Sequence, residues 1–416
     1  MYVGYEGFGF SAPGLAQIFF GVVAISLLLP ILPFQFDTLS ALLVWFFALT
    51  LLMPMLALYV FNSDNFASTK LQLIASLFLS LYVFRTLLIR MKPLKVPDKL
   101  ILESLVMRSA SKIFFAVMSI SILSIVLLVF AYHFSRIDIS LATLNDRRMT
   151  NRYSTGSFPG SAYVYAWIAA LLIPLNILSW VVFKKFLFLG FGIVIAIMVF
   201  STSGSKSDIL SPILAIAIFF VYSSSKKYMP ILLHHSIYFV IAAAPVILAL
   251  GASSPLLFLS TTRRMLFIPA RLSIEYFNYI SESGVTFFKQ NRLGFLFSGE
   301  QIPLSMIIGG RFASGNETNA NINAFMDGYA SLGIFGMLLM AFLLGVTVRG
   351  IENALNNSSF RELFVPLGFT ACTVWLNQAY FTSLLSSGVF LFLLIPYLNI
   401  TINKSRGLFK IMIESP

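Results

Sequence analysis

The sequence predicts an all-α polytopic membrane protein, a helical bundle of about 11 spans. Of its 416 residues, 58% are hydrophobic and only 11% are charged, and the mean hydropathy is +0.89. Soluble domains have roughly a quarter of their residues charged. Stretches of about 20 apolar residues, the length a helix needs to cross a bilayer, recur along the chain. These observations predict one integral membrane domain over residues 1–416.

The expected spans are apolar stretches separated by polar or basic connections. They lie at 14–33, 39–61, 69–89, 113–134, 161–183, 186–201, 208–222, 231–251, 324–348, 363–383 and 386–402. The count can vary between about 10 and 13, because a stretch as short as 186–201 can form half of a hairpin that does not fully cross. No internal repeat is evident.

The orientation follows from the basic residues, because short loops rich in Lys and Arg stay in the cytoplasm. The most basic stretch, 85–112, is expected inside, and the C-terminal tail falls on the same side. Two long connections, 135–160 and 252–323, then face outward. Both exceed the usual length of connections in a compact bundle, so we expect them to carry function.

Charge and cysteine content exclude several function classes. The net charge of +12 fits a membrane surface and phosphate-bearing ligands, and no basic face interleaved with aromatics indicates nucleic acid. Cys372 is the single cysteine, so no disulfide framework is expected. The three histidines lack metal-ligand spacing. We therefore expect neither a metal nor a cofactor.

The first long loop carries Arg147 and Arg148 beside Asp146. Arginine suits an electrostatic clamp for phosphate, because its planar fork binds two phosphate oxygens at once. The alternative is a solvated loop whose charges pair locally.

A second basic group, Lys206, stands in the connection TSGSKSD at 202–208. The Gly-x-x-x-x-Gly of a nucleotide-binding loop does not precede it. Either the segment is a plain tight turn, or Lys206 contacts phosphate near the start of a helix, where free backbone N–H groups favour anions.

The second long loop opens with RRMLFIPARLSIEYFNYI at 263–280, an expected amphipathic helix that Pro269 kinks or starts. Arg264 and Arg271 are seven residues apart and would share one face, and Glu275 can pair with Arg271 four residues earlier. Such a helix at the membrane interface would present its arginines at headgroup depth. The alternative is a plain interfacial anchor.

An asparagine-rich stretch then leads into a span at 309–336, with the sequence GGRFASGNETNANINAFMDGYASLGIFG. Asn and Gly there can cap a helix and form turns. However, Asp327 is expected just inside the span, where an ionisable group is costly unless it has a partner or a function. Asparagine amides also suit sugar hydroxyls.

These features resemble a known family. The small-residue turn with a basic residue, the R-R-x6-R helix and the Asn-rich stretch running into D-G-Y-x-x-x-G-x-x-G follow the order found in bacterial O-antigen polymerases, the Wzy-type oligosaccharide repeat-unit polymerases. The motifs cover about 202–208, 263–280 and 316–336. The R-x10-G motif of some members is absent from both long loops. The 252–323 loop has no histidine, which favours a polymerase over the related O-antigen ligases.

The resemblance implies a metal-independent GT-C-type glycosyltransferase of the bacterial inner membrane, with its active site facing the periplasm. Such enzymes transfer a growing glycan from undecaprenyl pyrophosphate onto a new lipid-linked repeat unit. A chain-length regulator in the same membrane would be a further partner. The alternatives are a flippase for lipid-linked oligosaccharide, against which the long outer loops argue, or an O-antigen ligase.

The expected site residues divide into three groups by chemistry. Cations would hold the pyrophosphate and stabilise the charge that grows as the glycosidic bond breaks. A carboxylate would accept the proton of the attacking hydroxyl. The cations are Lys206, Arg263, Arg264, Arg271, Arg147, Arg148 and Arg311. The candidate carboxylates are Glu317, Asp327 and Glu275. The expected sugar contacts are Asn319, Asn321, Asn323 and Tyr329.

Overall fold

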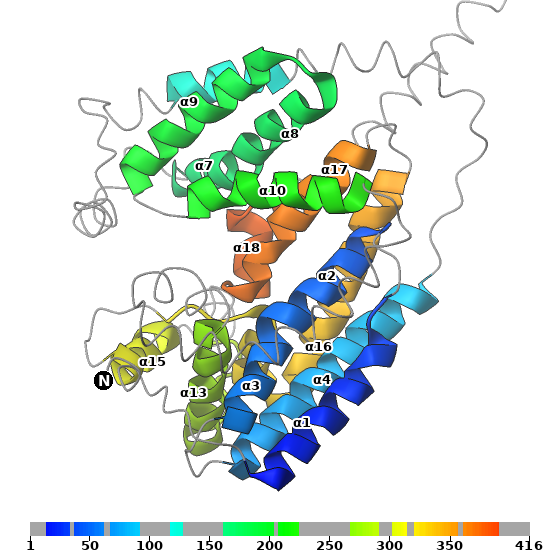
Figure 1. The fold of residues 1–416 in the computed structure, drawn as a ribbon. Helices are drawn as coiled ribbons and strands as arrows, with labels where there is room; N and C mark the ends of the chain where they lie inside the picture. Colours follow the sequence, from blue (N-terminus) through cyan, green and yellow to red (C-terminus); the bar gives the residue numbers. More distant parts are fainter. Residues whose placement is uncertain are drawn as a thin grey trace, which may run out of the picture. The chain divides into compact units, whose positions relative to one another are not determined.

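The computed structural model is helical and contains no strand in the part of the chain that it describes (Figure 1). That part comprises residues 14–33, 37–61, 67–91, 117–127, 161–203, 207–223, 267–290, 302–313, 320–356 and 361–390. The helices long and apolar enough to cross a membrane are Leu39–Val60, Lys70–Arg90, Tyr163–Phe183 and Ala324–Asn353. Shorter apolar helices lie at Leu15–Ile31, Val117–Leu127, Phe186–Ser201, Leu210–Ser223 and Leu363–Leu376. The all-α class is thus confirmed, whereas the count of about 11 spans and the GT-C architecture stay predictions.

Most predicted spans that fall on described residues coincide with helices, but the span predicted at 363–383 is interrupted. Its α-helix ends at Cys372, continues as a 3-10 turn to Leu376, and gives way to a new helix only at Tyr380. The polar pair Asn377–Gln378 stands at the interruption. The predicted span 231–251, most of 386–402 and the loop 135–160 lie outside the described residues.

The chain divides into two compact units. Unit 1 comprises 1–92, 225–349 and 373–382, and unit 2 comprises 93–224, 350–372 and 383–416. The elements of unit 1 are α1 (Leu15–Leu28), η2 (Leu29–Ile31), α2 (Leu39–Phe47), η3 (Ala48–Leu52), α3 (Met53–Phe61), α4 (Ala67–Arg90), α13 (Ile268–Ser283), α15 (Leu304–Ala313), most of α16 (Ala324–Asn356) and η7 (Thr373–Leu376). Unit 2 holds α7 (Ser161–Trp167), η5 (Ile168–Leu172), α8 (Ile173–Phe183), α9 (Phe186–Ser203), α10 (Ser207–Ser223) and α17 (Arg361–Cys372), and α18 (Tyr380–Ser386) begins in unit 1. The single domain over 1–416 stays a prediction.

The core of unit 1 forms around α2, which is buried along almost its whole length. Phe47 at its end meets Phe84 of α4 and Phe325 of α16, with ring centroids 6.0 and 5.2 Å apart. Both pairs are edge-to-face, an arrangement that aromatic rings prefer. The indole N–H of Trp45 donates to the carbonyl of Pro33 at 2.9 Å. These contacts fix α2 against α4 and the start of α16.

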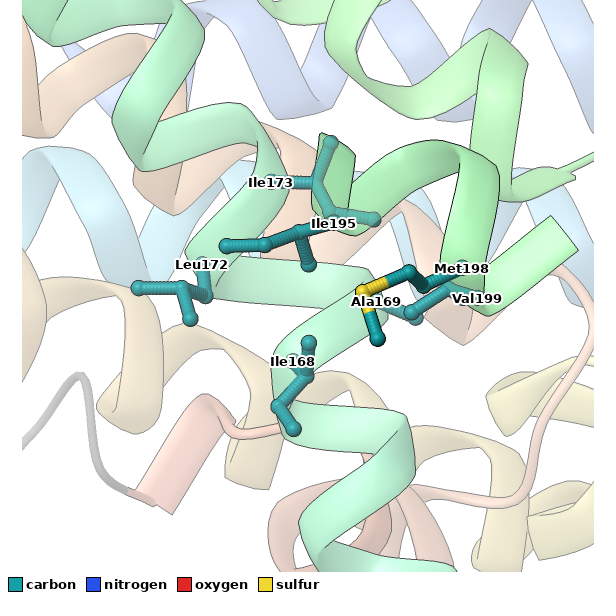
Figure 2. Packing of buried hydrophobic residues seen from close by; sticks show 7 residues of the cluster. All are labelled: Ile168, Ala169, Leu172, Ile173, Ile195, Met198 and Val199. Atoms are coloured by element: carbon teal, nitrogen blue, oxygen red, sulfur yellow. The ribbon is translucent and has the colours of Figure 1, made fainter. Parts of the chain in front are cut away.

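The core of unit 2 lies between η5, the start of α8, and α9 (Figure 2). Its side chains are aliphatic: Ile168, Ala169, Leu172, Ile173, Ile195, Met198 and Val199. A buried polar contact joins the helix Val117–Leu127 to α8, because the amide of Asn176 donates to the Ser121 hydroxyl at 2.9 Å. Such hydrogen bonds hold helices together in membranes, where apolar burial does not.

Two long helices, one in each unit, carry the same irregularity. The helix Leu39–Val60 contains the π turn η3, and the helix Tyr163–Phe183 contains η5. Each π turn ends in Leu-Leu, and a proline follows two residues later, at Pro54 and Pro174. A similar local structure therefore recurs where no internal repeat was evident. The sequence prediction missed it because the shared letters amount to little beyond Leu-Leu-x-Pro.

Candidate functional site

Two of the motif segments, 263–280 and 316–336, pack against each other in unit 1. The hydroxyl of Tyr276 on α13 donates to the carbonyl of Ala320 at 2.7 Å. Further along, the rings of Phe277 and Tyr329 stack with centroids 4.7 Å apart. The arginine-bearing helix and the D-G-Y segment, about fifty residues apart in sequence, therefore form one continuous structure, which we call the α13–α16 site.

The helix α13 overlaps the amphipathic helix predicted at 263–280, for which Pro269 was expected to be a kink or the start. Pro269 stands in its first turn, where the missing N–H would have no helical partner. The helix ends at Gly284, whose φ of 82° suits glycine. One face packs on α3, α4 and α15, and half of its residues are buried. α13 is therefore more deeply packed than a helix that only lies on a membrane surface.

Arg271 and Glu275 form the ion pair that their spacing predicted. The guanidinium Nη2 lies 2.8 Å from Oε1 of Glu275, and the side chains are 16% and 25% exposed. Partial burial strengthens such a pair relative to one in water. A phosphate that binds Arg271 would meet this carboxylate as a competitor or as a neighbouring proton acceptor.

Asn323 is built into the fold rather than open to a ligand. Its Oδ1 accepts from the backbone N–H of Met326 at 3.0 Å, which caps the start of α16. Its Nδ2 donates to the Ser273 hydroxyl of α13 at 2.8 Å. Asn321 is exposed, so among the described asparagines of the motif it is the one open to a sugar.

Asn323→Ala is expected to lower the free energy of unfolding by about 1–2 kcal/mol, because it removes a helix cap and a buried interhelical bond. The melting temperature of detergent-solubilised protein measures this loss. Asn321→Ala, two residues earlier and exposed, is the matched control and should melt as the wild type does. Equal melting temperatures for both variants would show that the cap does not contribute.

The two tyrosines at the contact hold it together in different ways. Burial, and secondarily the negative charge of Asp327, raise the pKa of Tyr276 well above its ordinary value. Its phenol therefore stays protonated and keeps donating to Ala320. Tyr329 is buried against Phe277, with its hydroxyl 3.3 Å from that of Ser281. Tyr329 thus has a packing role, whatever its part in sugar binding.

The helix α16 is broken just after the D-G-Y motif, at Leu332 and Gly333. Gly333 has φ 64° and ψ −148°, a conformation essentially restricted to glycine. In a continuous helix the carbonyls of Ala330 and Ser331 would accept from residues four positions later. Here Ala330 accepts from Thr286 N–H and Oγ1, each at 2.8 Å, and Ser331 from Phe287 N–H at 3.0 Å. The segment after α13 therefore caps the broken helix.

Two further glycines let the arms of the broken helix cross closely. A Cβ on Gly336 would lie 2.7 Å from the carbonyl carbon of Gly328, and a Cβ on Gly328 would lie 2.7 Å from that of Gly336. Only glycine permits backbones to approach so closely. The D-G-Y-x-x-x-G-x-x-G motif thus has a structural explanation, in which two glycines form the crossing and Gly333 forms the bend.

Asp327 lies on the short arm before the bend, rather than on the longer helix that follows it. Its side chain is fully buried. The amide Nε2 of Gln290 lies 3.2 Å from Oδ1 of Asp327 and 2.7 Å from the Ser331 hydroxyl, so it donates to two residues of the short arm. The hydroxyl of Thr286, which has one proton to donate, lies within reach of both Oε1 of Gln290 and the Ala330 carbonyl. Sequence reasoning missed Gln290 and Thr286, because nothing in the local pattern links them to residues about forty positions away.

Arg311 occupies the exposed end of this region, on α15. Its guanidinium stacks over the ring of Tyr279 at 4.6 Å and lies 3.5 Å from Glu282. Its side chain is 56% exposed, so its charge stays accessible to an anion in solution.

The remaining expected site residues lie outside the described residues: Lys206, Arg263, Arg264, Arg147, Arg148, Glu317 and Asn319. The helical face predicted for Arg264 and Arg271 stays a prediction, because α13 as described begins at Ile268. Compared with protein families, with curated proteins and with solved structures, the chain matches none.

Proposed function

We propose that this protein is a surface-polysaccharide polymerase of the O-antigen type in a bacterial inner membrane. It would transfer a growing glycan from undecaprenyl pyrophosphate onto a new lipid-linked repeat unit at the periplasmic face. The observation that carries the proposal is the α13–α16 site. Two of the three motif segments on which the family resemblance rests contact each other there.

The chemistry of the described residues supports roles for some of them. Arg271 would bind the pyrophosphate, because its fork matches two phosphate oxygens and partial burial strengthens the attraction. Arg311 would meet the anion from the exposed side. Both would stabilise the charge that develops on the leaving pyrophosphate.

The carboxylates differ in their access to a substrate. Glu275 is partly exposed and lies beside Arg271. This exposure favours Glu275 as the base that takes the proton from the attacking sugar hydroxyl. Asp327 is fully buried in a hydrogen-bonded network, which favours a role in holding the bend. Glu317 and Asp327 remain alternatives for the base.

A flippase for lipid-linked oligosaccharide is the second candidate. Broken helices and charged groups buried within spans are features of transporters. The break in α16 and the buried side chains of Lys70 and Asp327 favour this alternative. The long outer loops, which a transporter does not need, favour the polymerase.

Deletion of the gene distinguishes these functions. If the protein is the polymerase, surface glycan should consist of single repeat units in place of a ladder on a polysaccharide gel, because lipid-linked units still form and cross the membrane. A plasmid copy should restore the ladder. A ladder that persists in the deletion strain rules out the proposal. Loss of every unit identifies the flippase, and lipid-linked polymer that is never attached identifies a ligase.

A further inference from the structure

An exposed apolar surface surrounds the bend of α16. It consists of Val285, Phe287, Ile334 and Phe335, and we call it the bend surface. Phe287 and Phe335 are 60% and 69% exposed. The four residues lie close together, because Gly333 approaches Val285, with a Cβ on Gly333 3.9 Å from Cγ1 of Val285. Ile334 and Phe335 follow Gly333 directly.

The bend surface continues the exposed face of a membrane span. On α16, exposed apolar residues recur at Phe335, Phe342 and Val346, spaced seven and eleven residues from the first. That spacing places them on one side of a helix. α16 contains the candidate membrane span Ala324–Asn353. The exposed apolar face of such a span is expected to lie against lipid. Val285 and Phe287 extend this face beyond the helix, onto a segment that the sequence predicted to lie in an outer aqueous loop.

The expected depth of the bend in the membrane agrees with a position of the bend surface against lipid. Arg349 stands in a basic stretch that we expect at the cytoplasmic surface. Sixteen residues separate it from Gly333, which at about 1.5 Å each is roughly 24 Å. The hydrocarbon of a bilayer is about 30 Å thick. The bend is therefore expected within the outer part of the hydrocarbon.

Backbone hydrogen bonding at the bend suits that depth. Water is absent from the hydrocarbon, so every carbonyl there must find a partner within the protein. The carbonyls of Ala330 and Ser331, which the break deprives of helical partners, accept from Thr286 and Phe287. At the same turn Phe287 and Phe288 have φ of 50° and 66°. This left-handed conformation costs an L-residue roughly 1–2 kcal/mol. The turn adopts it with the side chain of Phe287 exposed on the protein surface.

We infer that residues 284–290 dip into the outer leaflet, where Val285 and Phe287 contact the acyl chains of the bilayer. The polar groups at the other end of the turn fit this placement. Glu282 at the end of α13 is 68% exposed, and its ion-pair partner Arg311 on α15 is 56% exposed, so both would reach the headgroups and water. This inference concerns the bilayer as a partner and does not depend on the proposed activity.

Nitroxide labels test the inference in the full-length protein. Single cysteines are introduced at Phe287, Phe335, Phe342 and Glu282 in a Cys372→Ser background, and the labelled proteins are reconstituted in lipid nanodiscs. Collision with oxygen, which concentrates in hydrocarbon, is compared with collision with a water-soluble nickel chelate. Phe342→Cys serves as the lipid control and Glu282→Cys as the aqueous control.

We expect the labels at Phe287 and Phe335 to favour oxygen over the nickel chelate, as the label at Phe342 does, and the label at Glu282 to show the reverse. A label at Phe287 that behaves like the one at Glu282 places the segment in water and overturns the inference. A label that neither reagent reaches shows that protein covers the surface, which overturns it as well. Val285→Cys on the same surface supplies the measurement if Phe287→Cys does not fold.

Discussion

Gly336→Ala should prevent unit 1 from assembling correctly, the largest structural effect that we expect from one added methyl group. The new Cβ would overlap the backbone of Gly328, and neither arm of α16 can yield without moving. Overpacking of a buried contact costs about 1–3 kcal/mol where side chains can shift. Here the obstacle is backbone, so the loss should be about 3 kcal/mol or more. Size-exclusion profiles and melting temperatures in detergent measure it.

The control for this variant lies on the same helix. A Cβ on Gly345 would meet Leu87 at 3.4 Å, an ordinary contact. Gly345→Ala should therefore be monodisperse and at least as stable as the wild type, because alanine favours a helix over glycine by roughly 1 kcal/mol. If Gly336→Ala behaves like Gly345→Ala, the arms of α16 do not cross as described.

Arg271→Ala should produce the largest loss of activity in a protein that still folds. We expect a loss on the order of 2–4 kcal/mol in transition-state stabilisation, as for removal of one oxyanion donor. That corresponds to a factor of roughly 30 to 1,000 in rate. Arg271→Lys keeps the charge but loses the bidentate fork, so it should impair polymerisation clearly but less severely. Ladder length, normalised to the amount of protein in the membrane, measures both effects.

Arg90→Lys, an exposed arginine at the end of α4, provides the matched control and should leave the ladder unchanged. The competing explanation is that Arg271 only stabilises α13 through Glu275. In that case Arg271→Ala would reduce the amount of protein, and each remaining molecule would polymerise normally. Such a result would remove Arg271 from the proposed site.

The sequence predicted those features that depend on neighbouring residues. Apolar length gave the helices, Pro269 was expected to kink or start a helix and stands in the first turn of α13, and a spacing of four residues paired Arg271 with Glu275. Each of these rests on local physical chemistry, namely burial, the missing N–H of proline and the pitch of a helix.

The features that sequence could not predict depend on contacts between distant segments. Gln290 reaches Asp327 only because the chain after α13 turns back onto α16. Nothing local marks Thr286 as a donor to the carbonyl of Ala330. Likewise the span expected at 324–348 was continuous in the sequence prediction, although its glycines allow the bend that the structure contains. Glycine permits such a conformation but does not require it.

The π turns of unit 1 and unit 2 each stand directly before a proline. Pro54 and Pro174 have no backbone N–H, and the ring of each crowds the carbonyl four residues earlier. In η3 and η5 the residue before the proline donates five positions back, from Met53 to Ala48 and from Ile173 to Ile168. The wider turn accommodates the proline, so each long helix continues past it, to Val60 and to Phe183.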